Sequence, residues 1–275
     1  MIKRSLLGVT AVAATLMLAA CGSSSNTATD TGSGDTGSSA ASGAASLSLV
    51  SPGTLTVCSD VPYAPFEDFD KSSPTGFKGF DIDIDSQLAT DLGLKLKVLD
   101  EDFDGLQSGL TLNAGTCDLV SSALTITPDR EKHLQFTDGY YDSEQSLLVP
   151  DNSSITSIDD LKGKKVGVQK GTTGETYANQ HASGASIVSF PSDAEEFSAL
   201  KAGQVDALLQ DLPVNLAHQQ AGGYKVVQQY ATGEKYGLAA KLGNTGLVNA
   251  INADLTKMKA DGTYKTIYNK YFSTK

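Results

Sequence analysis

The chain has 275 residues, of which 40% are hydrophobic, so it is long enough for one or two domains with buried cores. Asp and Glu number 32 against 21 Lys and Arg, which gives a formal net charge of −11. A negative balance of this size argues against nucleic acid or an anionic membrane surface as a binding partner.

The first 50 residues have the composition of a secretion leader followed by a linker. Two basic residues precede an apolar run over 6–20, which is too short and too rich in small residues to span a membrane well. The run ends in Leu-Ala-Ala-Cys, which matches the bacterial lipobox; an ordinary secretory signal is the alternative. We expect a signal peptide over 1–20, then a lipidated Cys21 and a flexible linker over 21–50 that hold the protein at the outer face of the cell membrane.

Between residues 54 and 124 the sequence alternates between strand and helix patterns. Alternation and β-branching predict a strand over Thr54–Ser59. Ile84, Leu88 and Leu92 then lie on one face of a predicted helix. The next elements are predicted as strand 94–99, helix 103–112 and strand 118–124. This β-α-β-α-β order indicates a parallel, doubly wound sheet.

A second lobe with the same order of elements follows an apolar run over 145–149. Its strands are predicted at 166–169, 186–190 and 205–210, and its helices at 174–182 and 194–202. A short strand over 236–240 is interpreted as the return to the first lobe, which helices at 245–260 and 264–271 complete. We therefore assign residues 51–143 plus 239–275 to lobe 1 and residues 144–238 to lobe 2. Two chain crossings between such lobes form a hinge beside a cleft.

Polar residues fall where four of the predicted strands end. They are Asp60, Ser122, Thr172 and Asp211. Ligands of open α/β sheets bind outside the carboxyl ends of strands, so these residues are candidates for a binding site. Beyond Ser122 a hydroxyl-rich turn leads to a helical turn that carries Arg130. Its planar guanidinium and the free backbone N–H groups nearby suit a carboxylate, although a surface salt bridge is the alternative role.

Four segments occur in the order and at roughly the spacing of one known family. They are Gly79-Phe80-Asp81-Ile82-Asp83-Ile84, residues 125–130, Gly171-Thr172-Thr173 and Gln210-Asp211. From about Thr54 to Phe272 the chain resembles the extracellular solute-binding proteins of polar amino-acid ABC transporters. The resemblance implies an α/β, two-lobed fold of the type II periplasmic-binding-protein kind, with a doubly wound, mainly parallel sheet in each lobe and a two-strand hinge. It also implies a monomeric binding protein, not an enzyme, that uses no cofactor and passes its ligand to an ABC permease.

In this family an Arg and nearby backbone amides hold the α-carboxylate of an amino acid, and an Asp of the second lobe holds its α-ammonium. By resemblance, the first role falls to Arg130, Thr125 and the turn of Thr172 and Thr173. The second falls to Asp211, for which a helix N-cap before Leu212-Pro213 is the alternative role. Ser122 and Ala123 match positions that offer a hydroxyl or carbonyl group to the ammonium.

The side-chain end of the ligand is assigned in the same way. Tyr63 and Phe103 match an aromatic pair that encloses the ligand side chain, with plain core packing as the alternative. Asp60 matches a position at the tip of the side chain, and Gln169 adds a neutral amide. A carboxylate there attracts a cation and repels a second carboxylate. We therefore expect arginine, lysine or histidine as the ligand, with glutamine next.

The strongest alternative keeps the fold and changes the activity. Some cyclohexadienyl (arogenate/prephenate) dehydratases resemble this family and use a Glu just after the second-lobe Gly-Thr loop as a general acid. Glu175 stands near that place, but Thr172-x-x-Glu175 also has the pattern of a capping box. Asp60 and Asp211 would disfavour a dicarboxylate substrate. A sensory domain that reports to a separate signalling protein is a third hypothesis.

Metal sites and a disulfide are not expected. The three His are scattered, and the acidic positions Asp81, Asp83 and Asp85 lack the Gly and Glu that a calcium loop needs, so we interpret them as helix-start carboxylates. Cys58 should lie level with residue 120 of the neighbouring strand. That would leave Cys117 three residues away, at ~10 Å, beyond the reach of a disulfide.

Overall fold

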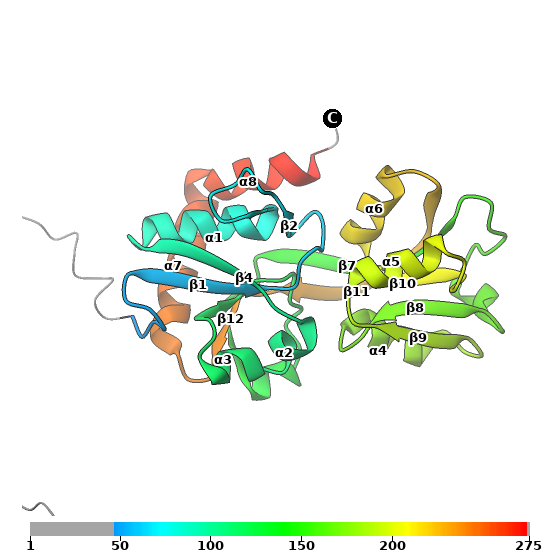
Figure 1. Ribbon diagram of the computed structural model, residues 1–275, viewed down its shortest axis with the longest axis horizontal. Coiled ribbons are helices and arrows are strands. Elements are labelled where there is room, and N and C mark those ends of the chain that lie inside the picture. Colours follow the sequence, from blue (N-terminus) through cyan, green and yellow to red (C-terminus); the bar gives the residue numbers. More distant parts are fainter. Residues whose placement is uncertain (1–46, 274–275) are drawn as a thin grey trace, which may run out of the picture. The chain divides into compact units, whose positions relative to one another are not determined.

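The computed structural model describes residues 47–273. The expected signal peptide and the expected lipid-carrying Cys21 lie outside these residues. The described chain forms two five-stranded sheets and one small two-stranded sheet (Figure 1). Over the same residues, every helix is too short or too polar to cross a membrane.

The first large sheet has the strand order β4-β1-β5-β12-β6. Its strands are β1 (Thr54–Ser59), β4 (Lys95–Asp100), β5 (Leu119–Val120), β6 (Leu134–Phe136) and β12 (Ala239–Lys241). β1 is parallel to β4 and β5, whereas β12 is antiparallel to β5 and β6. The chain segments that follow β1, β4 and β5 therefore leave the sheet at the same edge.

Helices cover both faces of this sheet. One face packs against α1 (Phe80–Asp91), α7 (Thr245–Asp261) and α8 (Thr263–Phe272), and the other against α2 (Phe103–Gln107) and α3 (Leu110–Ala114) (Figure 1). Ile84 and Leu88 of α1 are fully buried against Leu55 and Val57 of β1. Burial of each such side chain contributes about 1.5–3 kcal/mol. The small sheet, β2 (Asp68–Phe69) with β3 (Phe77–Lys78), precedes α1.

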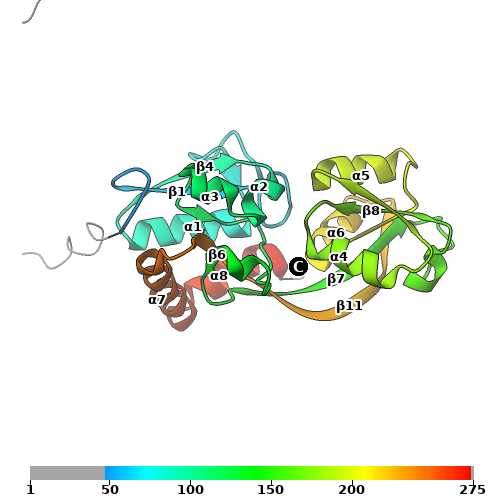
Figure 2. The ribbon, with the colours of Figure 1, turned by 90° about the horizontal axis from the view of Figure 1, so that it is seen from below.

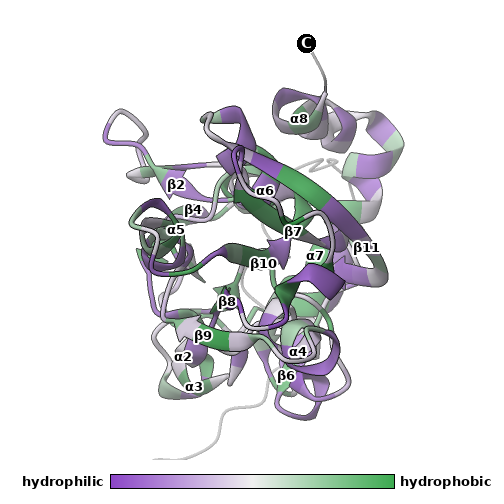
Figure 3. Cartoon of the chain, turned by 90° about the vertical axis from the view of Figure 1, so that its right-hand side faces the viewer, coloured by the Kyte–Doolittle hydropathy of each residue, from purple (hydrophilic) through white to green (hydrophobic). Residues whose placement is uncertain are grey.

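The second large sheet has the strand order β11-β7-β10-β8-β9. Its strands are β7 (Tyr141–Pro150), β8 (Lys165–Gln169), β9 (Ser186–Phe190), β10 (Ala207–Asp211) and β11 (Tyr224–Tyr236). Its helices are η3 (Ile158–Leu161), α4 (Thr173–His181), α5 (Asp193–Lys201) and α6 (Leu212–Gln220). β10 is wholly buried, as expected of a central strand that is covered on both faces. Figure 3 shows hydrophobic residues along β7 and β10 and long hydrophilic stretches on the edge strand β11.

Two strands join the sheets. β7 and β11 are antiparallel from the Tyr224–Pro150 pair at one end to the Tyr236–Tyr141 pair at the other, and Figure 2 shows them side by side. The expected two-lobed α/β fold with a two-strand hinge is therefore confirmed. The expected return strand over 236–240 is wrong, because β11 ends at Tyr236 and β12 already belongs to the first sheet.

Two other predicted elements are shorter than expected. The helix expected over 103–112 is divided into α2 and α3, because Gly109 adopts a left-handed conformation with φ 74°. The strand expected over 118–124 ends at Val120, after which the chain turns and Ala123 takes φ 44°. Apolar residues continue through Leu124, so periodicity could not mark this turn.

Cys58 and Cys117 form a disulfide, which corrects the prediction that they would stay apart. The expected register is right, since Cys58 does lie opposite Val120. The spacing estimate is wrong, because the residues before β5 do not continue the strand. Gly115 ends α3 in a left-handed conformation, and the chain bends at Thr116 and Asp118, on either side of Cys117. These bends bring the two Cα atoms to 5.9 Å, within the range of a disulfide.

Candidate functional site

The eleven candidate residues line one cavity between the two large sheets. The empty space between these residues is about 300 Å³, a figure that includes the open side of the cavity. The first sheet and its loops contribute Asp60, Tyr63, Phe103, Ser122, Ala123, Thr125 and Arg130, and the second contributes Gln169, Thr172, Thr173 and Asp211. Most of these positions follow the carboxyl end of a strand, which explains why distant segments converge.

Arg130 begins a short 3₁₀ helix, Arg130–Lys132, and its side chain is buried rather than paired on the surface. Its guanidinium donates to the carbonyl oxygens of Thr125 at 2.7 Å and Gly171 at 3.0 Å, and lies 5.4 Å from the centroid of the Phe103 ring. Burial lowers the pKa of Arg130 to about 10, against the opposing effect of nearby carboxylates, so the group stays charged at neutral pH. Within 47–273 no carboxylate forms an ion pair with it. A buried cation with unused N–H donors is suited to bind an anion.

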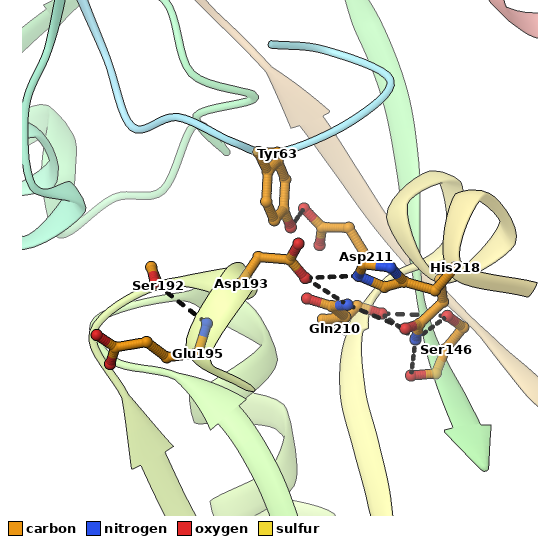
Figure 4. A network of polar contacts seen from close by, with 9 residues as sticks. Tyr63, Ser146, Ser192, Asp193, Glu195, Gln210, Asp211 and His218 are labelled. Atoms are coloured by element: carbon orange, nitrogen blue, oxygen red, sulfur yellow. Dashed lines mark hydrogen bonds and ion pairs between the residues drawn. The ribbon is translucent and has the colours of Figure 1, made fainter. Parts of the chain in front are cut away.

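Asp211 ends β10 of the second sheet, is buried and lines the same cavity. It precedes α6, but its carboxylate makes no capping bond to that helix. Instead it accepts from the hydroxyl of Tyr63 at 2.9 Å (Figure 4). It also accepts from the hydroxyl of Tyr236 and from the amide of Gln145. Burial raises the pKa of Asp211 to about 6, and Glu234 adds to the rise while these hydrogen bonds oppose it.

The end of β10 is fixed by a buried polar network behind Asp211. The amide of Gln210 donates to Asp193 and to Asn215, both at 3.0 Å, and the amide of Asn215 donates to the Ser146 hydroxyl at 2.9 Å. His218 lies 2.8 Å from the same oxygen of Asp193 (Figure 4). Such a connected network restricts the position of the strand end and hence of the carboxylate that follows.

Ser122 and Ala123 form the wall of the cavity on the first sheet. The Ser122 hydroxyl donates to Glu67 at 2.8 Å and accepts from the backbone N–H of Asp60 at 3.0 Å. The Ala123 N–H donates to Asp81 at 2.8 Å. The backbone carbonyls of Ser122 and Ala123 have no hydrogen bond to the described part of the chain. The carbonyls, rather than the Ser hydroxyl, are therefore the groups that remain available to a ligand.

Asp60 and Gln169 meet at one end of the cavity. The Gln169 amide donates to Asp60 at 2.5 Å and to the Pro191 carbonyl at 3.2 Å. Burial raises the pKa of Asp60 to about 7; the Gln169 hydrogen bond opposes the rise, and the carboxylates of Asp100, Asp102 and Asp193 add to it. This end of the cavity is therefore electronegative, and a cation placed there would be stabilised.

Thr172 and Thr173 form the start of α4 and line the cavity. The Thr172 hydroxyl accepts from the N–H of Glu175 at 3.1 Å, as in a helix cap. The Glu175 carboxylate accepts from the Gly171 N–H at 2.7 Å and from the Ser189 hydroxyl, and it does not line the cavity. This side chain stabilises the loop, so its geometry gives no support to a general acid at this position.

Sequence reasoning missed a set of hinge-strand residues next to the cavity. Gln145 of β7 and Glu234 of β11 are 3.0 Å apart, and the same Glu234 oxygen accepts from Thr173 at 3.1 Å and lies 3.4 Å from the Thr125 hydroxyl. Tyr236 at the end of β11 contacts Asp211. These residues were missed because the sequence did not predict β11 as a strand. β11 is half exposed, and its sequence has no clear alternation of apolar and polar residues.

Over residues 47–273 no group of three or more His, Cys, Asp or Glu side chains could hold a metal ion. The fold and the cavity define the class: a two-lobed α/β binding protein of the type II periplasmic-binding-protein kind. Residues 55–274 match the model of the bacterial extracellular solute-binding proteins, family 3, and the chain belongs to this family.

The chain is similar along most of its length to amino-acid-binding members of the family. It is 39% identical over 198 residues to the ABC transporter glutamine-binding protein GlnH of Bacillus subtilis, which covers 70% of this chain and 72% of that protein. It is 34% identical over 233 residues to a putative ABC transporter arginine-binding protein of Escherichia coli, with 82% and 94% covered. Among solved structures, an ancestral arginine-binding protein bound to glutamine has a TM-score of 0.76 and 40% identity, with 81% and 99% covered.

Proposed function

We propose that this protein binds a polar or basic L-amino acid between its lobes and delivers it to an ABC permease. The observation that carries the proposal is the pair of opposite charges on one buried cavity, Arg130 on one lobe and Asp211 on the other. An α-amino acid carries a carboxylate, which Arg130 can bind, and an ammonium group, which Asp211 can bind. Its variable side chain extends from the same carbon atom. The named functions of the glutamine-binding and arginine-binding relatives support the same class of ligand.

In the proposed complex the α-carboxylate lies against the Arg130 guanidinium and the turn of Thr172 and Thr173. The α-ammonium lies between Asp211 and the free carbonyls of Ser122 and Ala123. Charge-assisted hydrogen bonds at both poles are short and strong in a site shielded from water. The α-carboxylate and the α-ammonium are attached to the same carbon atom of the ligand. When both groups are held, the side chain on that carbon is directed away from Arg130 and Asp211.

The side chain of the ligand extends between Tyr63 and Phe103 toward Asp60 and Gln169. No Lys or Arg contacts Asp60 within the described residues, so a cationic ligand would supply the missing counter-charge. Arginine, lysine and histidine are therefore the favoured ligands. Glutamine is next, because an amide can exchange hydrogen bonds with Asp60 and Gln169 but leaves the charge of Asp60 uncompensated.

Binding is coupled to closure of the hinge formed by β7 and β11. Contacts that cross the cleft include Tyr63 with Asp211 at 2.9 Å and Lys170 with Asp104 at 2.9 Å. We take residues 51–143 plus 239–275 and residues 144–238 as the two moving lobes. A ligand held by Arg130 on one lobe and Asp211 on the other favours the closed form through contacts that the open form lacks.

The protein is placed outside the cytoplasm, in keeping with its family of extracellular binding proteins. We propose that lipid on Cys21 anchors it there and that residues 21–50 act as a tether. Mass spectrometry of the membrane fraction tests the anchor: the mature chain should begin at an acylated Cys21. A chain released without lipid would overturn this part of the proposal.

A thermal-shift screen of the twenty L-amino acids, followed by calorimetry on the hits, tests the function. A ligand at about 100 times its Kd adds about 2.7 kcal/mol to the free energy of unfolding. Arginine, lysine or histidine should stabilise most, then glutamine, and aspartate and glutamate should have no effect. If no amino acid raises the melting temperature, the proposed function is wrong.

A further inference from the structure

Three buried carboxyl side chains lie close together in the first lobe, and two of them contact residues that line the cavity. Glu67, Asp81 and Asp85 are each fully buried. Over residues 47–273 none of them forms an ion pair with Lys or Arg. Burial of several carboxyls without a cation opposes folding. The hydrogen bonds that these side chains make show what they hold in place.

Asp81 holds the backbone of Ala123. One of its oxygens accepts from the Ala123 N–H at 2.8 Å, and the hydroxyl of Tyr140 contacts both oxygens at 2.8 and 2.7 Å. The sequence-based interpretation of Asp81 as a helix-start carboxylate is thus incomplete. It does lie in the first turn of α1, but its hydrogen bonds go to other elements.

The conformation of Ala123 explains why it needs such a partner. Its φ of 44° is the one positive value among the described residues other than Gly, and an L-residue is strained in this region. The turn therefore persists only if the surroundings hold it. A hydrogen bond from the Ala123 N–H to a buried carboxylate is a strong constraint of this kind.

Glu67 holds the neighbouring residue in a similar way. It accepts from the Ser122 hydroxyl at 2.8 Å, and that hydroxyl accepts from the backbone N–H of Asp60 at 3.0 Å. One buried carboxyl thus fixes Ser122 and, through it, the backbone of Asp60. Asp85 makes no hydrogen bond to Ser122 or Ala123.

We propose that Asp81 and Glu67 are positioning residues of the binding site. They hold the turn of Ser122 and Ala123 so that its free carbonyls and Asp60 face the ligand. This role rests on the proposed function, in which those carbonyls meet the ligand ammonium. It also gives Asp81, in the Gly79-Phe80-Asp81 segment, a role beyond that of a helix-start carboxylate.

The test compares variants that keep or remove the acceptor. Asp81→Leu leaves the Ala123 N–H without a partner, whereas Asp81→Asn retains one acceptor oxygen. Calorimetry with L-arginine, or with L-glutamine if that binds more tightly, should show at least a tenfold rise in Kd for Asp81→Leu. The rise for Asp81→Asn should stay below threefold.

Two matched controls separate positioning from general stability. Tyr140→Phe removes the other partner of Asp81, and Asp85→Asn alters a carboxyl of the same cluster that makes no hydrogen bond to Ser122 or Ala123. Tyr140→Phe should lower the melting temperature because it removes hydrogen bonds to Asp81, and both controls should leave Kd within twofold of the parent. If either control weakens binding as much as Asp81→Leu, the effect is general and the proposal is wrong.

A second pair of variants covers the case in which Asp81→Leu does not fold. Glu67→Leu should raise Kd at least tenfold, whereas Glu67→Gln still accepts from Ser122 and should bind nearly as the parent does. Hydrogen exchange of the Ala123 amide needs no ligand, and it should accelerate in folded Asp81→Leu. Unchanged Kd and unchanged exchange would overturn the proposal, whereas altered exchange in a protein that binds no amino acid would refute the proposed function alone.

Discussion

Replacement of Arg130 by Ala should abolish most ligand affinity while leaving a folded protein. Arg130 is 4% exposed, and its guanidinium donates to two backbone carbonyls, those of Thr125 and Gly171. These bonds use part of its fork and direct the remaining N–H groups toward the cavity. The change therefore removes the charge that meets the carboxylate, the bond to Thr125 within the first lobe and the bond to Gly171 that joins the lobes.

The magnitude follows from these contacts. Loss of two charge-assisted bonds to a desolvated carboxylate costs about 3–5 kcal/mol, which is roughly a 10²- to 10⁴-fold rise in Kd. The carbonyls of Thr125 and Gly171, left without a donor, lower the free energy of unfolding by about 1–3 kcal/mol. Arg130→Lys keeps the charge without the fork, so its loss of affinity should be intermediate.

Calorimetry with the best amino-acid ligand measures the first effect, and urea unfolding without ligand measures the second. Lys132→Ala is the matched control, since Lys132 lies in the same 3₁₀ helix but is exposed and paired only with Asp129. Its affinity should equal that of the parent. If Arg130→Ala binds within threefold of the parent, the carboxylate does not lie at Arg130 and the assigned site is wrong.

Three further predictions follow. Because burial raises the pKa of Asp60 to about 7 and a cationic ligand favours the charged form, arginine affinity should fall about fivefold from pH 7 to pH 6, whereas glutamine affinity should not. Titrations at several pH values check this, and Asp60→Asn should remove the difference. Asp211→Asn should raise Kd at least 50-fold for every amino acid, and an unchanged Kd would place the ammonium elsewhere. Reduction of the Cys58–Cys117 disulfide, which closes a loop with a sequence separation of 59, should lower the free energy of unfolding by about 2–4 kcal/mol in urea melts, and equal melts would contradict a structural role.

The convergence of the candidate residues could be predicted because sheet topology is simple to infer. Once β1, β5, β8 and β10 are recognised as strands of doubly wound sheets, Asp60, Ser122 and Asp211 must follow their carboxyl ends. Tyr63 and Phe103 have no such signal in their pattern and came from the family resemblance. That all of them bind a ligand stays a prediction.

Other features depend on contacts that local pattern does not encode. β11 is an edge strand with polar residues on its exposed face, so neither it nor Glu234 stood out as part of a site. Asp81 accepts a hydrogen bond from Ala123, which is 42 residues away along the chain. Its place in the first turn of a helix already explained an acidic residue there, so nothing in the sequence indicated a distant partner. The approach of Cys117 to Cys58 required knowledge of a bend that no residue spacing reveals.

The most direct test measures binding of an L-amino acid and of its decarboxylated amine to the same protein. The cavity is lined by the buried guanidinium of Arg130 and the buried carboxylate of Asp211. Tight binding should therefore require both the α-carboxylate and the α-ammonium of the ligand. In calorimetry, L-arginine should bind at one site per chain, and agmatine, which lacks the α-carboxylate, should bind at least 100-fold more weakly. The same contrast should hold for glutamine and its amine. Equal affinities for acid and amine, or no binding of either, would contradict recognition of a zwitterion between the lobes.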